Sequence, residues 1–287
     1  MNERQKAPDV VGLLCGAGAL PLRAAETLRQ HGSRVVAVGI KGEADAAIEQ
    51  FADETHWTGI AKLGRWLKIF GNASADVVLM LGAIEKSRMF GDKKLLLPDW
   101  QTIKLWYGGL KGKQDHSILG AVADRFEEAG LPVGSVVDYC PELLVPPGCL
   151  TGTEPDDREW RDIRFAWPIA KQIAALQIGQ CIVVKEEAVV AVEGIEGTDA
   201  ALRRGGRLAG EGAVAVKLAK QGHDERFDIP CIGPQTVDTL EEAGIAVLAV
   251  EADKTIGLDL EEVKEKADRC GVSIVAVSDA EMTGEDT

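Results

Sequence analysis

The sequence predicts an α/β protein with two domains. Three observations support this fold class: short apolar runs alternate with amphipathic segments, glycines or prolines separate them, and residues 139–156 hold four prolines among loop-forming residues. The proline-rich stretch is the clearest domain boundary, so we expect domains at 1–140 and 157–287 joined by a linker at 141–156. A chain of 287 residues is long enough for two packed domains.

The N-terminal half alternates between predicted strands and helices. Apolar runs predict strands at 9–15, 34–40, 76–84 and 132–139. Helices are expected from Pro21 to about Gln30, where His31 and Gly32 end the segment, and at 62–71 and 115–130. Strands that alternate with helices in this way form a parallel sheet covered by helices on both faces.

The C-terminal half has a different pattern. A helix near 157–175 precedes CIVVKEEAVVAV, which predicts a hairpin whose short polar loop is Lys185, Glu186 and Glu187. Thr198 or Asp199 as the N-cap predicts a helix through residue 204. Strands at 213–219, 245–250 and 272–278, with helices at 235–243 and 259–270, complete a mixed α/β domain.

Composition and charge exclude several classes of protein. A formal net charge of −14 argues against a nucleic-acid partner bound through its phosphates. The six cysteines form no C-x-x-C pair and the four histidines no H-x-x-x-H spacing, which argues against a zinc site or a disulfide framework. The sequence begins without an apolar signal segment and holds no run long enough to span a membrane, so we expect a cytoplasmic protein.

Two stretches of the N-terminal half could contact an anion. In GLLCGAGALP, Gly16 and Gly18 follow a strand and Pro21 opens a helix, which favours a nucleotide or sugar-phosphate loop over a simple tight turn. The dinucleotide fingerprint is incomplete, because Pro21 stands in place of its third glycine, and this argues against NAD binding. In KGKQDHSIL, the simplest interpretation of Asp115 is that it is the N-cap of a helix. Alternatively, the two lysines before it could bind an anion.

The stretch VEGIEGTDAALRR carries more charge than a capped helix requires. Capping accounts for Thr198 or Asp199 but leaves Glu193 and Glu196 unexplained, and Glu193 ends a buried strand, where an unpaired carboxylate is costly. The two arginines at 203 and 204 lie one helical turn further on and could pair with these acids or bind phosphate.

The stretch KLAKQGHDERFDIPCIGPQT concentrates charged residues after a predicted strand. Lys217 and Lys220 precede His223, Asp224, Glu225, Arg226 and Asp228. Basic residues beside several carboxylates suit a divalent metal held by oxygen ligands next to a phosphate, although a surface salt-bridge network fits the composition equally well.

Together these motifs resemble the metal-dependent UDP-2,3-diacylglucosamine pyrophosphatases of lipid A biosynthesis, the two-domain type with a Rossmann-like N-terminal domain. The first stretch matches the family pattern V-E-A-x-E-G-T-D-A-M-x-R-R at Glu193, Glu196, Gly197, Thr198, Asp199, Arg203 and Arg204. The second matches V-K-x-x-K-P-x-Q-D-x-R-F-D at Lys217, Lys220, Asp224, Arg226 and Asp228. GAGALP is similar to the family's G-x-G-x-L-P through Gly16, Gly18, Leu20 and Pro21, and Asp115 matches the first acid of K-G-D-D-x-L-L. Gln177 and His116 depart from the pattern, since both stand in place of family aspartates.

The resemblance implies hydrolysis of UDP-2,3-diacylglucosamine to UMP and 2,3-diacylglucosamine 1-phosphate (lipid X), with Mg²⁺ or Mn²⁺ as cofactor. It implies that Asp228 binds the metal or activates water, that Asp199 and Asp224 are further metal ligands or supports, and that Lys217, Lys220, Arg204 and Arg226 contact the phosphates. The other matching residues would bind substrate.

The lipid substrate implies a peripheral protein in transient contact with the cytoplasmic face of the inner membrane. The sequence leaves open whether the protein forms a homo-oligomer. Two alternatives remain: a non-catalytic protein that binds a UDP-sugar or lipid, and a nicotinamide-dependent oxidoreductase.

Overall fold

The computed structural model describes residues 8–84, 98–108, 115–219, 226–227 and 229–283. The chain divides into two compact units, one of Met1–Pro141 with Asp224–Phe227 and one of Glu142–His223 with Asp228–Thr287. A short segment of the C-terminal half thus belongs with the N-terminal unit. None of the described helices is long and apolar enough to cross a membrane.

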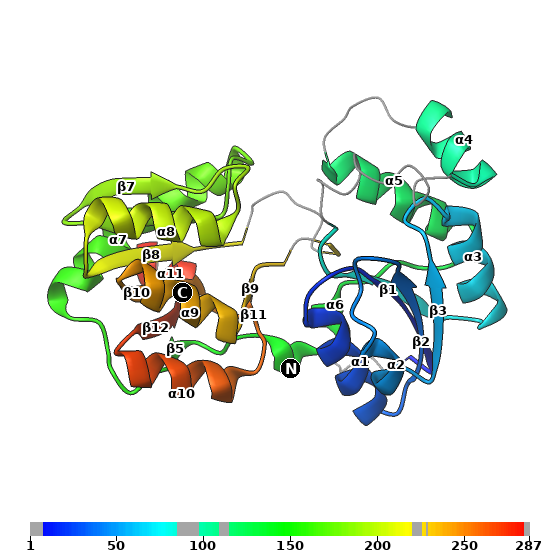
Figure 1. The fold of residues 1–287 in the computed structure, drawn as a ribbon, viewed down its shortest axis with the longest axis horizontal. Helices are drawn as coiled ribbons and strands as arrows, with labels where there is room; N and C mark the ends of the chain where they lie inside the picture. Colours follow the sequence, from blue (N-terminus) through cyan, green and yellow to red (C-terminus); the bar gives the residue numbers. More distant parts are fainter. Residues whose placement is uncertain (1–7, 85–97, 109–114, 220–225, 228, 284–287) are drawn as a thin grey trace. The chain divides into compact units, whose positions relative to one another are not determined.

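The N-terminal unit is built on a parallel sheet, as the sequence predicts, with four strands in the order β3-β2-β1-β4 (Figure 1). The edge strand β3 is not among the predicted strands. The strands are β1 (Val10–Cys15), β2 (Arg34–Ile40), β3 (Glu54–Thr58) and β4 (Val77–Leu81). The helices are α1 (Leu20–Gln30), α2 (Ile48–Phe51), α3 (Leu63–Asn72), α4 (Trp100–Gly108), α5 (Asp115–Glu128) and α6 (Val136–Tyr139). On one face, Phe70 of α3 and Phe126 of α5 pack with ring centroids 5.9 Å apart, and α1 packs against β1 and β2 on the other.

The strand expected at 132–139 is wrong. Only Val133 pairs with the sheet, in a single bridge to Val78, and the chain then turns into the short helix α6. Pro132 has no N–H to donate to a ladder, and a Cβ at Gly134 would lie 2.7 Å from the Tyr139 ring. A valine-rich run is compatible with either structure, and here pairing ends after Gly134, where Ser135 becomes the N-cap of α6.

The C-terminal unit contains a six-stranded mixed sheet in the order β5-β12-β10-β8-β6-β7, with a small parallel pair β9-β11 beside it. The strands are β5 (Gly148–Cys149), β6 (Cys181–Lys185), β7 (Ala188–Val192), β8 (Ala213–Lys217), β9 (Cys231–Ile232), β10 (Ile245–Glu251), β11 (Ile256–Gly257) and β12 (Ser273–Val277). The helices are α7 (Asp157–Ala175), α8 (Thr198–Ala209), α9 (Pro234–Ala243), α10 (Leu260–Cys270) and α11 (Asp279–Thr283), with a 3-10 turn at Pro141–Leu143.

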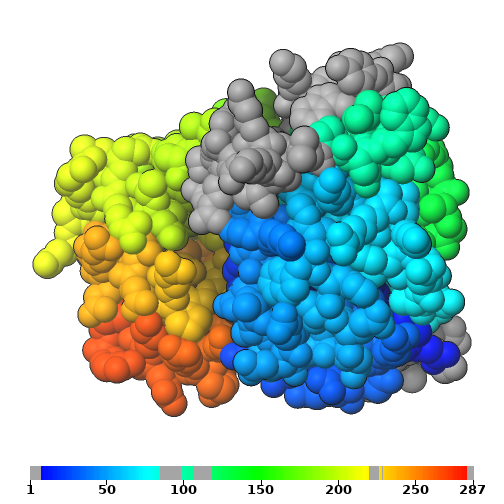
Figure 2. Space-filling model, turned by 45° about the vertical axis from the view of Figure 1, so that its right-hand side comes forward, coloured from blue at the N-terminus to red at the C-terminus, as the bar shows by residue number. Residues whose placement is uncertain are grey.

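Helices cover both faces of this sheet. Helices α8, α9 and α10 lie side by side on one face, where they appear as yellow, orange and red-orange layers (Figures 1 and 2). Helix α7 packs on the other face through Ile163, Trp167 and Ala170, with Met282 of α11 against the same core. Most residues of the inner strands β6, β8, β10 and β12 are buried because helices cover both faces, whereas the edge strands β5 and β7 are more exposed.

The predicted hairpin between β6 and β7 is confirmed, with Glu186 and Glu187 as its two-residue loop. Both loop residues have positive φ, 50° and 57°, as a type I′ turn requires. The buried carboxylate of Asp162 in α7 accepts both loop N–H groups at 3.0 and 2.6 Å. Helix α7 therefore holds the loop in a conformation that Asn-Gly would adopt with less strain.

Two glycines allow α8 to approach its neighbours closely. A Cβ at Gly205 would lie 2.6 Å from Val183 of β6, and a Cβ at Gly206 would lie 1.8 Å from the carbonyl oxygen of Ala243 in α9. This packing fixes α8 between the sheet and α9, and with it the N-terminal end of α8, where the candidate site lies.

Candidate active site

Two charged side chains lie on either side of Cys181 at one end of the C-terminal sheet. Lys217 ends β8 and is the register partner of Cys181 in β6, while Glu193 follows β7 and donates its backbone N–H to the Cys181 carbonyl at 2.8 Å. Cross-strand neighbours point to the same face of a sheet. Glu193 and Lys217 are both only 7% exposed, so the structure places an acid and a base together in a largely buried row.

The Cys181 thiol lies among these charges. Burial, helped by Glu193 and Asp199 and opposed by Lys217, raises the pKa of Cys181 to about 12. A thiol with so high a pKa stays protonated at neutral pH and is not a nucleophile. The chemistry of this row therefore belongs to the carboxylates and the ammonium group.

The carboxylate of Glu193 is used to hold the surrounding backbone. Its Oε1 accepts the Thr198 hydroxyl at 3.2 Å and its Oε2 accepts the Gln180 N–H at 3.2 Å. These contacts explain how an acid can end a buried strand. They join the loop before β6 to the start of α8.

The predicted N-cap of α8 is wrong. Gly197 is the N-cap, with φ 84° and ψ 166°, and no side chain caps the helix. Thr198 and Asp199 lie in the first turn, where the Thr198 hydroxyl bonds Glu193 instead. The carboxylate of Asp199 accepts no hydrogen bond from any residue that the structure describes, so it is free of the capping role that the sequence assigns to it.

Arg204 and Arg203 diverge. The guanidinium of Arg204 donates to the Val192 carbonyl at 2.7 Å and to the Glu196 carboxylate, whose other oxygen accepts the Gly194 N–H at 3.1 Å. The backbone N–H of Glu196 itself, followed by Arg204, lowers the pKa of this carboxyl below its usual value. Glu193 with Thr198 and Glu196 with Arg204 thus form two neighbouring hydrogen-bonded pairs, and Arg204 pairs with an acid, one of the two alternatives that the sequence left open.

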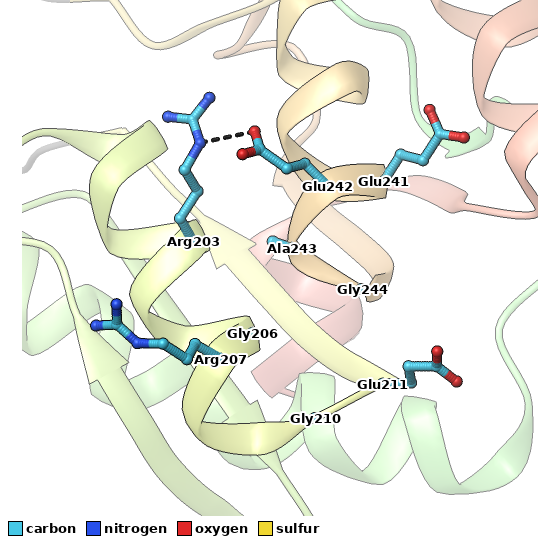
Figure 3. Close-up of a pocket in the computed structure, with 9 residues that line it drawn as sticks. All are labelled: Arg203, Gly206, Arg207, Gly210, Glu211, Glu241, Glu242, Ala243 and Gly244. Carbon is cyan, nitrogen blue, oxygen red and sulfur yellow. Dashed lines mark hydrogen bonds and ion pairs between the residues drawn. The ribbon is translucent and has the colours of Figure 1, made fainter.

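Arg203 instead turns to α9, where its Nε lies 2.8 Å from Glu242 (Figure 3). It lines a cavity of about 610 Å³ with Arg207, Glu211, Glu241 and the glycine ends of α8 and α9. This cavity lies toward the opposite end of α8 from Thr198 and Asp199. Its lining mixes both signs of charge without a convergent set, so we do not place the chemistry there.

Lys217 contacts the backbone that follows the charged loop. Its Nζ donates to the Cys231 carbonyl at 2.8 Å, and an ammonium group has two further donors. Its predicted partners Lys220, Asp224 and Asp228 lie outside the described residues. Arg226 is described: its guanidinium lies 2.6 Å from Glu127 of α5 and 5.1 Å from the Phe227 ring.

The predicted N-terminal loop uses part of its backbone internally. The Gly16 N–H donates to the Leu81 carbonyl at 2.8 Å, and Ala17 and Ala83 exchange two hydrogen bonds at 2.7 and 3.0 Å. Gly18, with φ 99°, then leads into α1, where Leu20 and Pro21 open the helix as predicted. The amides left for an anion are those of the first turn of α1. Asp115 begins α5, but its side chain lies outside the described part of the chain.

The departure at Gln177 lies at the C-terminal end of α7. Gln177 follows the C-cap of α7 with φ 59°, its N–H bonds the Ala174 carbonyl, and the Ile178 N–H bonds the Ile173 carbonyl. This is a Schellman motif, whose left-handed position is usually glycine and sometimes asparagine. The departure from the family aspartate therefore lies at a helix end, and the backbone does not explain the choice of Gln.

A divalent metal fits the described residues only in part. No group of three His, Cys, Asp or Glu side chains that could hold a metal occurs among them. Of the three predicted ligands, Asp199 is described, half-buried and without a described hydrogen-bond donor, which suits an oxygen ligand of Mg²⁺ or Mn²⁺. Asp224 and Asp228 would have to complete the set.

Sequence reasoning missed a second charged cluster. Glu251 ends β10, is 1% exposed, and bonds Lys171 of α7 and Lys254. An acid at the end of an apolar run is the same signal that marked Glu193, so IAVLAVE could have been found by it.

Two solved structures show a weak likeness to parts of this chain. A UDP-glucose-4-epimerase structure from Stenotrophomonas maltophila with bound NAD matches at 23% identity over 42% of this chain and 34% of that chain, with a TM-score of 0.29. A biotin carboxylase domain from Hydrogenobacter thermophilus matches at 15% identity over 64% of this chain and 36% of that chain, with a TM-score of 0.26. Neither likeness is close enough to support an argument.

The sequence relatives are far more informative. The UDP-2,3-diacylglucosamine pyrophosphatase LpxI of Caulobacter vibrioides is 30% identical over 281 residues, which cover 94% of this chain and 98% of the relative. The family model of the LpxI N-terminal domain matches residues 10–143, and that of the LpxI C-terminal domain matches residues 146–275. The chain belongs to the LpxI family.

Proposed function

We propose that this protein hydrolyses the pyrophosphate of UDP-2,3-diacylglucosamine to UMP and 2,3-diacylglucosamine 1-phosphate, a step of lipid A biosynthesis. The observation that carries the proposal is the match to the Caulobacter vibrioides enzyme over nearly the full length of both chains. The charged groups at the sheet end fit this chemistry, because a pyrophosphate needs cations on its oxygens and a positioned water.

The roles of the described residues follow from their contacts. Lys217 and the positive end of α8 would face the phosphate oxygens, since the first-turn N–H groups of a helix have no intrahelical partners. Asp199 would bind the metal, together with Asp224 and Asp228. Glu193 would hold Thr198, and through it the start of α8, in place. Lys220 and Arg226 remain proposed phosphate contacts.

Mg²⁺ or Mn²⁺, when bound, would neutralise charge on the pyrophosphate and lower the pKa of a water. Asp228 is the leading candidate to position that water. We further propose that the protein works at the cytoplasmic face of the inner membrane, where a diacylated substrate would be found.

The experiment is a direct assay of the purified protein. With Mg²⁺ or Mn²⁺ it should release UMP from UDP-2,3-diacylglucosamine, and Asp228→Ala should abolish turnover while leaving the circular dichroism spectrum unchanged. Binding of the substrate without UMP release would instead identify a non-hydrolytic binding protein, and full activity of Asp228→Ala would remove Asp228 from its proposed role.

A further inference from the structure

The buried acid of β10 makes one contact that charge pairing does not explain. Oε1 of Glu251 accepts Lys171 Nζ at 2.8 Å and Lys254 Nζ at 2.7 Å. Oε2 accepts the backbone N–H of Ala219 at 3.2 Å. Ala219 is the second residue after the end of β8. Glu251 is therefore attached at once to α7 and to the chain that leaves β8.

Lys171, which bonds Glu251, is itself held by a further acid. Lys171 also bonds Asp279 of α11 at 2.7 Å, and the other oxygen of Asp279 accepts the Trp167 indole N–H at 2.8 Å. Burial alone would raise the pKa of Asp279, but the hydrogen bonds from Lys171 and Trp167 outweigh it and lower that pKa. Helices α7 and α11 thus hold Glu251 in one orientation.

Stability alone is a poor explanation for this arrangement. A buried ion pair costs so much desolvation that apolar residues of similar size are often as stabilising or more so. The contact to Ala219 has a more specific consequence, because Ala219 lies two residues after Lys217, the proposed phosphate contact. Lys217 itself donates to the Cys231 carbonyl at 2.8 Å. Buried charged side chains on opposite faces of the sheet therefore hold the end of β8 that carries Lys217.

We propose that Glu251 is a positioning residue for the hydrolysis, acting through its hydrogen bond to the Ala219 N–H. This inference rests on the proposed function for its kinetic consequence. Glu251 does not contact substrate in this account. It fixes the direction in which the chain leaves β8, and a small misplacement of catalytic groups is enough to slow a reaction strongly.

Two variants separate the backbone contact from the charge. Glu251→Gln keeps an oxygen that can accept the Ala219 N–H, whereas Glu251→Leu has a similar size and removes it. Asp279→Asn is the matched control, because it disturbs the same lysine but does not touch Ala219. We expect Glu251→Leu to lower kcat by about tenfold or more with KM nearly unchanged, and Glu251→Gln and Asp279→Asn to stay within about threefold of the parent.

Equal losses in the Gln and Leu variants, or a loss confined to KM, would overturn the positioning role, as would full kcat in folded Glu251→Leu. Hydrogen–deuterium exchange gives a readout that needs no activity. Exchange in a peptide covering 218–231 should rise in Glu251→Leu and not in Asp279→Asn, and unchanged exchange would contradict the proposal. If the parent protein released no UMP, the proposed function would fail while the exchange result would still decide whether Glu251 holds the chain.

Discussion

Helix α8 offers a sharp test of how the C-terminal unit is packed, through the substitution Gly206→Ala. A Cβ at this position would lie 1.8 Å from the Ala243 carbonyl oxygen and 3.0 Å from the Ala243 Cβ. The obstacle is backbone of α9, which cannot rotate away as a flexible side chain can. The two helices would have to separate until the contact reached an ordinary distance of about 3.5 Å.

Two opposing effects set the magnitude. Alanine has a higher helix propensity than glycine by about 1 kcal/mol. Overpacking a well-packed region costs about 1–3 kcal/mol, and contact with backbone favours the upper end of that range. We therefore expect Gly206→Ala to lower the free energy of unfolding by about 2 kcal/mol, which for a protein of this size lowers Tm by about 4–8 °C.

Gly120→Ala in α5 is the matched control. It lies inside a helix with nothing within 4 Å of the added Cβ, so only the propensity gain applies, and we expect a small rise in stability. Urea and thermal unfolding followed by circular dichroism measure both variants. A Gly206→Ala protein as stable as the parent would refute the close packing of α8 against α9.

Three further predictions concern the hairpin, the arginine pair and the buried network. Replacing the loop by Glu186→Asn and Glu187→Gly should raise the free energy of unfolding by about 1 kcal/mol in urea titrations, because both positions have positive φ; a loss of stability would contradict the turn assignment. Arg204→Met should reduce UMP release by about tenfold, since methionine can donate to neither the Val192 carbonyl nor the Glu196 carboxylate, whereas Arg203→Met should stay within about twofold; equal effects would place both arginines in one role. The folded-state pKa of Asp279 is lowered, so its stabilisation is present above the ordinary value of 3.8 and is lost as pH falls through the folded pKa. The difference in urea midpoint between the parent and Asp279→Asn should therefore be larger at pH 7 than at about pH 3, and a constant difference would contradict it.

Patterns local in sequence predicted most of the fold. Hydrophobic periodicity, together with the glycines, prolines and caps that end each segment, predicted the parallel N-terminal sheet, the hairpin and the helices of the C-terminal unit. Each of these features depends on residues within one element. The strand predicted at 132–139 is wrong because the chain makes a single bridge at Val133 and then begins helix α6 after Ser135. The prediction of the α8 N-cap was wrong because the glycine before Thr198 adopts positive φ and takes the cap position.

The candidate site shows the same division. Glu193 meets Thr198, and Glu196 meets Arg204, because all four lie within one strand-turn-helix stretch. Arg203 is adjacent to Arg204, but neighbouring residues on a helix point about 100° apart, so it faces α9. The Glu251 network escaped prediction because its partner Lys171 is 80 residues away in the chain, and only the packing of α7 on the sheet brings them together.

The central claim is that this chain cleaves the pyrophosphate of UDP-2,3-diacylglucosamine with the help of a carboxylate at the start of α8. The most direct measurement quantifies UMP and 2,3-diacylglucosamine 1-phosphate together, with Mg²⁺ or Mn²⁺, for the parent, Asp199→Asn and Asp157→Asn. Asp157 is an exposed acid in the first turn of α7 and serves as the matched control. We predict equimolar products from the parent and from Asp157→Asn, and a loss of about a hundredfold or more in Asp199→Asn. Substrate binding without either product in the parent, or full turnover in Asp199→Asn, would contradict the claim.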